Sequence, residues 1–250
     1  MLVTKMPDGS PELFQAVQGE GTTIGKPYVF VRFSICNLHC KYCDSYFTWN
    51  FNDIKSENNH YKSKVCRKDN QIEMTVKQLV DCITKFPCKR VLFTGGEPMI
   101  YQKEIFQVIV ALLKKDDTYW FEIETNGTIK INDDLFQLIN QINCSPKLQS
   151  SGNSPLVANK PEVIKQFKTK PNTVFKFVVC QRTAIQDLIE IKEWQDSYGI
   201  NNEDTWLMPE GVTRTKILAG SRFIIEHFLP QGYNLSTRLH ILLFNNKRAV

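Results

Sequence analysis

Long hydrophobic runs are absent from this sequence of 250 residues. No stretch approaches the roughly 18 consecutive apolar residues that a membrane-spanning helix needs, so we expect no membrane association. Residues 1–7 offer neither an apolar run nor a small-residue cleavage site, which argues against a secretory signal. We therefore expect a cytoplasmic protein whose eight cysteines are thiols rather than disulfides.

A strong excess of either charge is also missing. The chain has 31 Lys and Arg residues against 26 Asp and Glu residues, a net charge of +5. The basic residues are scattered, whereas a nucleic-acid-binding surface normally clusters them, so we expect no direct nucleic-acid binding. An anionic small-molecule substrate suits this mild balance. Internal repeats and low-complexity tracts are lacking too, which favours a single domain over residues 1–250.

The sequence does contain a regular alternation of strand and helix patterns. Runs of β-branched and aromatic residues predict strands at 28–34, 90–94, 119–124, 173–180 and 205–208, with a short one before 145. Helical spacing of apolar residues predicts helices at 75–86, 102–115, 133–142, 184–194 and 222–229. About six such units indicate a parallel α/β sheet that forms an open, partial β/α barrel. A polar insertion at about 51–71 interrupts the pattern.

Three cysteines, Cys36, Cys40 and Cys43, follow the first predicted strand within eight residues. Three thiolates on one short loop can each bind a different iron of a 4Fe–4S cluster. A cluster held by protein alone needs four cysteines, so one iron would stay open for chemistry. The alternative is a zinc site or a non-catalytic iron–sulfur module, with His39 as the nearest fourth ligand. Zinc sites, however, more often use paired C-x-x-C segments.

Two further features lie on predicted strands. A double glycine at 95–96 follows strand 90–94 directly, and Glu97 comes next. Glycines let the backbone approach a ligand closely, and a carboxylate there can accept hydrogen bonds from an ammonium group. A plain strand-to-helix turn is the alternative. Arg32 lies among apolar residues of the first predicted strand and needs an anionic partner. Either Glu20 or a substrate carboxylate would supply it, the latter through a bidentate pair.

The order of these motifs resembles one known family. The C-x-x-x-C-x-x-C spacing is that of the radical S-adenosylmethionine (SAM) superfamily, and the whole set resembles the 7-carboxy-7-deazaguanine synthases. The segments that carry the resemblance are Gln-Gly-Glu-Gly at 18–21, Phe-Val-Arg at 30–32, Cys-Asp-Ser at 43–45, Thr-Gly-Gly-Glu-Pro at 94–98, Glu-Thr-Asn-Gly at 124–127, Ser-Pro-Lys at 145–147, Leu-His at 239–240 and Asn-Lys-Arg-Ala-Val at 246–250.

The resemblance implies a lyase that contracts the ring of 6-carboxy-5,6,7,8-tetrahydropterin to 7-carboxy-7-deazaguanine and releases ammonia, in queuosine-type deazapurine biosynthesis. It implies a 4Fe–4S cluster, SAM and Mg²⁺ as cofactors. It also implies a homodimer and an electron donor such as flavodoxin or ferredoxin. A glycyl-radical activase of the same superfamily is the main rival, but that enzyme has no need of the 18–20 turn together with Arg32.

The same resemblance implies roles for individual residues. The cluster would be held by Cys36, Cys40 and Cys43, and Mg²⁺ would be bound by Ser45. The substrate would be bound by Val17, Gln18, Gly19, Glu20, Arg32, Thr94 and Val250. SAM would be bound by Tyr42, Cys43, Asp44, Gly95, Gly96, Glu97, Thr125, Ser145, Pro146, Lys147, Met208, Pro209 and Glu210.

Overall fold

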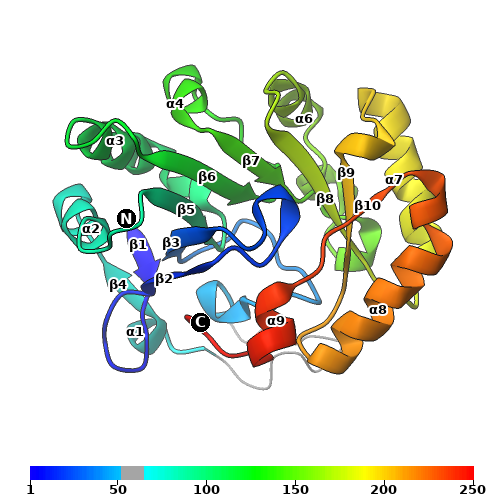
Figure 1. The fold of residues 1–250 in the computed structure, drawn as a ribbon, viewed down its shortest axis with the longest axis horizontal. Coiled ribbons are helices and arrows are strands. Elements are labelled where there is room, and N and C mark those ends of the chain that lie inside the picture. The colour runs from blue at the N-terminus through cyan, green and yellow to red at the C-terminus, as the bar shows by residue number, and fades with distance from the viewer. Residues whose placement is uncertain (52–64) are drawn as a thin grey trace.

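A computed structural model describes residues 1–51 and 65–250, and within them ten strands form one open sheet. The strand order is β10-β9-β8-β7-β6-β5-β3-β1-β4, with β2 paired to β3 (Figure 1). The strands are β1 (Leu2–Thr4), β2 (Leu13–Val17), β3 (Pro27–Phe33), β4 (Gln71–Glu73), β5 (Arg90–Gly95), β6 (Trp120–Thr125), β7 (Gln141–Cys144), β8 (Thr173–Val179), β9 (Thr205–Pro209) and β10 (Asn234–Leu235).

The parallel part of the sheet confirms the predicted fold class. Six strands, β3 and β5 to β9, pair with their neighbours in parallel, and β10 extends them by two residues. The antiparallel strands β1, β2 and β4 were not predicted. Strands of three residues, such as β1 and β4, are too short to show an alternating pattern in the sequence.

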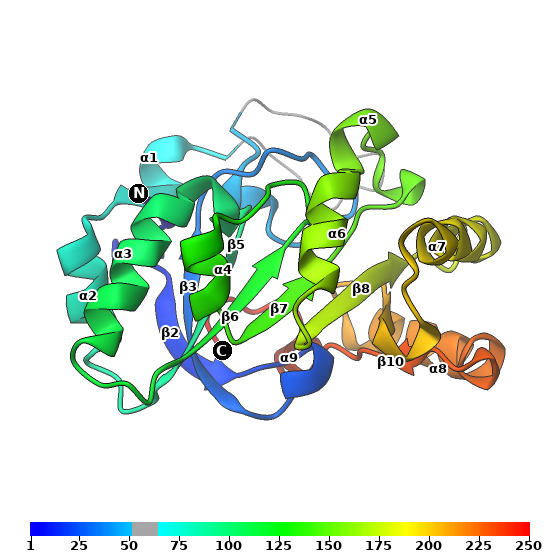
Figure 2. The same ribbon diagram turned by 90° about the horizontal axis from the view of Figure 1, so that it is seen from above.

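Helices line the outer side of the curved sheet, whereas α9 and the C-terminus lie on its inner side (Figures 1 and 2). The helices are α1 (Arg67–Asn70), α2 (Val76–Ile83), α3 (Gln102–Leu113), α4 (Asp133–Leu138), α5 (Pro155–Ala158), α6 (Pro161–Lys168), α7 (Ala184–Tyr198), α8 (Arg214–His227) and α9 (Leu239–Phe244). The core packs apolar side chains of the sheet, such as Val31 and Phe93, against helix residues such as Leu79 and Ile105. The apolar core therefore lies between the sheet and the outer helices, and polar side chains can occupy the inner side of the sheet.

Helix boundaries were predicted best where capping and periodicity agree. Helix α2 begins after Thr75, as expected, and the Thr75 hydroxyl and Gln78 side chain cap the first turn reciprocally. Helix α8 contains residues 222–227 of the range predicted to be helical, but it begins eight residues earlier, at Arg214. Its real N-cap is Thr213, whose hydroxyl accepts from the Lys216 N–H. The first turns of α8 contain several exposed polar residues, so the helical spacing of apolar residues cannot be recognised there in the sequence.

The predicted insertion at 51–71 is only partly within the described residues. Residues 52–64 lie outside them, but 67–70 form α1 and Gln71 opens β4. Strand β4 pairs with β1, with Val3 opposite Ile72. The end of this segment is therefore part of the sheet, and the extent of the insertion stays a prediction. No helix among the described residues is both long and apolar enough to cross a membrane.

Candidate active site

A cavity lies where the parallel strands end. Its walls include the last residues of β5, β6, β7, β8 and β9, and opposite them the 17–20 turn, the cysteine loop and the tail 246–250. The carboxyl ends of parallel strands meet at one edge, which is why ligand sites of α/β folds collect there. The sequence predicted this location because the motifs follow strands directly.

The cysteine loop leaves β3 and is held against the end of β5 by close backbone contact. The Gly96 N–H donates to Phe33 O at 3.0 Å, and the Glu97 N–H donates to Ile35 O at 2.9 Å. A Cβ atom on Gly95 would lie 2.2 Å from Phe33 O, and one on Gly96 would lie 2.0 Å from Ile35 O. Both glycines line the cavity. Glycine is needed at these two positions because the backbone of the cysteine loop approaches so closely, and not because a ligand does.

Cys36, Cys40 and Cys43 all line this cavity. Burial raises the pKa of all three thiols, that of Cys36 to about 12. A bound cationic cluster reverses that preference, since metal ligation requires the thiolate. Within the described residues no three His, Cys, Asp or Glu side chains converge on a single metal ion. A four-iron cluster does not require such convergence because each thiolate binds its own iron, so the donor set fits a cluster.

His39, the fourth ligand of the alternative zinc site, does not form a group of three potential metal ligands with the cysteines among the described residues. Its ring packs against Trp49 with 4.9 Å between the ring centroids. His39 is also not among the residues that line the cavity. The zinc alternative therefore gains no ligand from this side chain.

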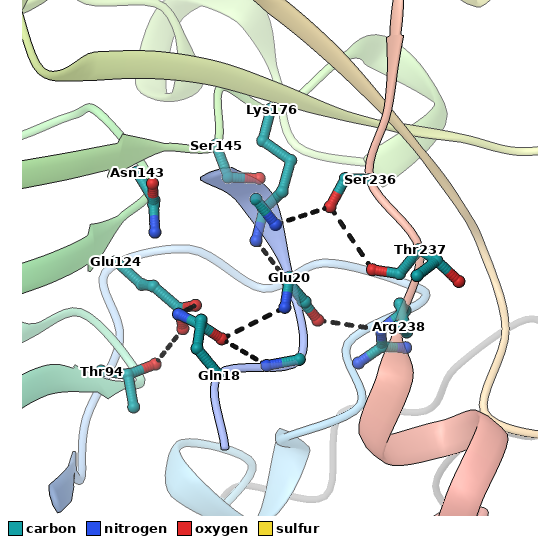
Figure 3. Close-up of polar contacts among 12 residues, drawn as sticks. Gln18, Glu20, Thr94, Glu124, Asn143, Ser145, Lys176, Ser236, Thr237 and Arg238 are labelled. Carbon is teal, nitrogen blue, oxygen red and sulfur yellow. Dashed lines mark hydrogen bonds and ion pairs between the residues drawn. The ribbon is translucent and has the colours of Figure 1, made fainter. Parts of the chain in front are cut away.

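Opposite the cysteine loop, Glu20 lies in a buried charge network (Figure 3). Its carboxylate pairs with Lys176 of β8 and accepts from Arg238 Nε at 3.0 Å. Burial alone raises the pKa of Glu20, but Lys176 and Arg238 outweigh burial and hold that pKa well below its ordinary value. Arg238 also pairs with Asp44 and donates to Gly211 O at 2.6 Å. One arginine thus joins the 17–20 turn to the cysteine loop.

Of the two partners considered for Arg32, Glu20 and a substrate carboxylate, the structure does not bear out Glu20. Arg32 Nε donates to Glu12 Oε1 at 3.1 Å, and Glu12 Oε2 accepts from Arg248 Nη2 at 2.6 Å. Glu12 immediately precedes β2, which pairs with β3, so the antiparallel pair brings the two side chains together. Since β2 was not predicted as a strand, the sequence offered no reason to choose Glu12.

The side-chain amide of Gln18 is fully engaged within the protein. Its Nε2 donates to Glu122 Oε1 at 2.8 Å and to Glu124 Oε1 at 3.2 Å. Its Oε1 accepts from the N–H groups of Gly19 at 2.8 Å and Glu20 at 3.2 Å. An amide has two N–H donors and two acceptor lone pairs, so this side chain braces the turn.

Glu122 fixes the same turn from below the cavity. It is fully buried and accepts hydrogen bonds from Thr23 Oγ1 at 2.9 Å, Tyr28 OH at 2.6 Å and Asn143 Nδ2 at 2.6 Å. Burial raises the pKa of Glu122. This carboxylate therefore positions the turn and Asn143 without lining the cavity itself.

The cavity gathers the predicted site residues with two exceptions, Glu97 and Pro146. The Glu97 carboxylate is fully buried and accepts from Met99 N at 3.0 Å, Thr125 Oγ1 at 2.8 Å and Asn126 N at 2.8 Å. It caps the 98–101 turn and holds the loop after β6. Its proposed contact with SAM remains a prediction.

Several polar lining residues were not among the predicted ones. These include Glu124, Asn126, Asn143, Lys176, Arg238 and His240, and in the tail Asn246, Lys247 and Arg248. A signal existed for Lys176, which lies inside an otherwise apolar strand, as Arg32 does. Asn126 and His240 lie within segments that carry the resemblance. Arg238 has no local signal, because its partners are distant in the sequence.

Comparisons with known proteins agree with this geometry. Residues 30–146 match the profile of the Radical SAM superfamily. The chain is 30% identical to the 7-carboxy-7-deazaguanine synthase of Halobacterium salinarum, over 94% of this chain and 90% of that protein. It is 28% identical to the synthase of the same name from Pyrobaculum aerophilum, over 95% of each.

The fold also matches a solved structure. The crystal structure of QueE from Escherichia coli superposes with a TM-score of 0.65 and 21% identity, over 96% of this chain and 95% of that one. This likeness confirms the partial barrel. With the similarity to the Halobacterium protein along almost the whole chain, it leads to one conclusion: the chain belongs to the 7-carboxy-7-deazaguanine synthase family of radical SAM enzymes.

Proposed function

We propose that the protein contracts 6-carboxy-5,6,7,8-tetrahydropterin to 7-carboxy-7-deazaguanine and releases ammonia. The observation that carries this proposal is the pairing of two walls in one cavity. The 17–20 turn, Arg32 and the three-cysteine loop line one cavity, and Arg238 joins the turn to the loop through its ion pairs with Glu20 and Asp44. A radical enzyme needs this juxtaposition because the substrate must lie next to the SAM-derived group that takes a hydrogen from it.

The cluster and SAM occupy the cysteine-loop side in this proposal. When bound, a 4Fe–4S cluster with one open iron supplies the electron that cleaves SAM reductively. Cys36, Cys40 and Cys43 hold it. Around SAM we expect the lining residues Tyr42, Asp44, Gly95, Gly96, Thr125, Ser145, Lys147, Met208, Pro209 and Glu210. A low-potential electron donor such as flavodoxin or ferredoxin completes the system.

The charge balance at Arg32 supports a role in binding the substrate carboxylate. Glu12 is one carboxylate between two guanidinium groups, those of Arg32 and Arg248. This set of three carries one positive charge in excess, which an anionic ligand can balance. Val250 lines the same cavity and would bring its C-terminal carboxylate to the substrate.

Magnesium and dimerisation are finer proposals. The Ser45 hydroxyl lies 2.9 Å from Asp44 Oδ1, which supports a shared Mg²⁺ site because this ion prefers oxygen ligands. A homodimer is supported by exposed apolar side chains, which are Leu218 and Ile225 on α8, each 44% exposed, and on α9 Leu243, 51% exposed, and Phe244, 45% exposed. Such side chains are more often found at interfaces when they gather on adjoining helices.

The direct test is turnover of the pterin by the reconstituted enzyme. Anaerobic reconstitution should give about four irons per chain. With SAM, Mg²⁺ and reductant, mass spectrometry should then detect 7-carboxy-7-deazaguanine and one ammonia per product. Cleavage of SAM without this product would instead indicate another radical reaction, for which a glycyl-radical activase is the first candidate.

A further inference from the structure

Each of the three cluster cysteines accepts an N–H hydrogen bond at its sulfur. Trp49 Nε1 donates to Cys43 Sγ at 3.2 Å, and Asn153 Nδ2 donates to Cys40 Sγ at 3.2 Å. Cys36 Sγ accepts from the Leu38 N–H at 3.5 Å. Two of these donors are side chains that the substrate and SAM roles above do not use.

Both side-chain donors are fixed by the same residue of the loop. The Asn153 Oδ1 accepts from the His39 N–H at 2.9 Å, and the Asn153 amide also donates to Ser151 Oγ at 3.0 Å. The Trp49 ring packs on the His39 ring and is 7% exposed. The N–H groups are therefore oriented towards the sulfurs by contacts that do not involve the cluster, so little ordering remains when it binds.

We propose that Trp49 and Asn153 raise the reduction potential of the cluster and so ease its one-electron reduction from the 2+ to the 1+ state. The electron comes from the low-potential donor, and no bond to the protein forms or breaks. Reduction adds negative charge to the thiolate sulfurs. An N–H dipole interacts more favourably with the more negative sulfur, so it stabilises the reduced state more than the oxidised one.

A third amide contributes less in this account. Asn126 Nδ2 lies 3.8 Å from Cys36 Sγ and also donates to Asn37 Oδ1 at 2.9 Å. The longer distance to sulfur and the competing acceptor weaken its effect. The inference concerns only the cluster, so it does not depend on which molecule the enzyme converts.

The test compares two tryptophan substitutions in the reconstituted protein without pterin. Trp49→Phe keeps the ring against His39 but removes the N–H group. Trp120→Phe is the matched control, because Trp120 Nε1 has no hydrogen-bond partner among the described residues. The potential is measured by a redox titration followed by electron paramagnetic resonance. Trp49→Phe should lower the equilibrium constant for reduction about twofold to fivefold, or about 18 to 41 mV for one electron. The control should match the wild type.

A second variant guards against a loss of structure. Asn153→Ala should also shift the potential to more negative values, and iron content is determined for each protein. An unchanged potential in a Trp49→Phe protein with about four irons per chain overturns the proposal. If both variants lose their iron, the two side chains act only in holding the loop, and the redox role is rejected.

Discussion

At the residue scale, Glu20 depends on two cations for its burial. Lys176→Met should destabilise the fold by about 3–5 kcal/mol, because a buried carboxylate then keeps only Arg238 as a cationic partner. Urea denaturation of the wild type and the variant measures this loss. The double variant Glu20→Gln, Lys176→Met serves as control and should recover part of the stability, since no charge is left uncompensated. Equal stability of wild type and Lys176→Met would contradict the argument.

The same carboxylate gives a pH dependence with a defined sign. The pKa of Glu20 is lowered in the folded state because Lys176 and Arg238 outweigh the opposing effect of burial. Its contribution to stability is therefore full above the unfolded pKa of about 4.3 and is lost as the pH falls towards the folded pKa. The difference in unfolding free energy between wild type and Glu20→Gln should shrink on acidification, and a growing difference would refute this.

A substitution of Arg32 tests the proposed binding of the substrate carboxylate most directly. Arg32→Lys keeps a positive charge beside Glu12 but loses the planar fork of the guanidinium group. The variant should fold, keep its cluster and cleave SAM slowly without substrate. Its kcat/KM for the carboxylated pterin should fall. The decrease should correspond to a loss of about 2–4 kcal/mol of transition-state stabilisation.

A purely structural role for Arg32 makes a different forecast. Breaking the pair from the other side, with Glu12→Gln, would then lower the melting temperature as much as Arg32→Lys does. Kinetics of Arg32→Lys would also stay at the wild-type level. Melting temperatures and substrate kinetics on the two variants separate these cases.

At the scale of elements, a glycine contact sets the position of the cysteine loop against the sheet. Gly96→Ala should disrupt it, because the added methyl group would lie 2.0 Å from Ile35 O, a backbone atom that cannot rotate away. We expect a loss of about 1–3 kcal/mol in stability together with a loss of bound iron. Circular dichroism melts and iron analysis measure both.

Gly25 provides the comparison for that substitution. A methyl group on Gly25 meets nothing within 4 Å, although its φ of +83° is unfavourable for alanine. Gly25→Ala should therefore cost about 1 kcal/mol and leave the iron content unchanged. Loss of iron in Gly25→Ala, or retention in Gly96→Ala, would show that close approach is not what positions the loop.

Elements with strong periodicity were the ones that the sequence predicted well. Helix α3 (Gln102–Leu113) starts at the predicted residue, and β5 and β6 lie within one residue of their predicted starts. Helix α6 (Pro161–Lys168) was missed, although Pro161 at its first turn and Val163, Ile164 and Phe167 on its buried side mark it in hindsight. Helix α2 has the same length of eight residues but is marked by the N-cap Thr75, whereas the residue at the N-cap position of α6 is Lys160, which makes no side-chain cap.

At the scale of the molecule, the cavity is assembled from segments far apart in the chain. Motifs that directly follow strands could be located from the sequence, because parallel strands bring their carboxyl ends to one edge. The charge partners of Glu20 could not be located from the sequence. Lys176 is 156 residues from Glu20, and Arg238 is 218 residues from it. Only the folded topology selects such partners, and for the same reason Glu12 rather than Glu20 pairs with Arg32.

The last five residues close this assembly, which gives a test for the whole molecule. Residues 246–250 line the cavity, and Arg248 holds them in place through Glu12, through Lys5 O and by packing over the Phe47 ring. Asn245 instead supports helix α8, since its side chain accepts from the Arg214 N–H at 3.1 Å. A chain ending at Asn245 should therefore fold, bind its cluster and cleave SAM.

Pterin turnover by that shortened chain should fail. Without the tail, Glu12 loses Arg248, and the cavity loses both the positive charge of Arg248 and the lining residue Val250. We expect kcat/KM to fall about 100-fold, equivalent to about 2.7 kcal/mol. Arg248→Met in the 250-residue chain separates the two losses, because it removes the charge and keeps Val250. Full activity of the shortened chain would mean that the tail covers the cavity without contributing to the binding of its ligand.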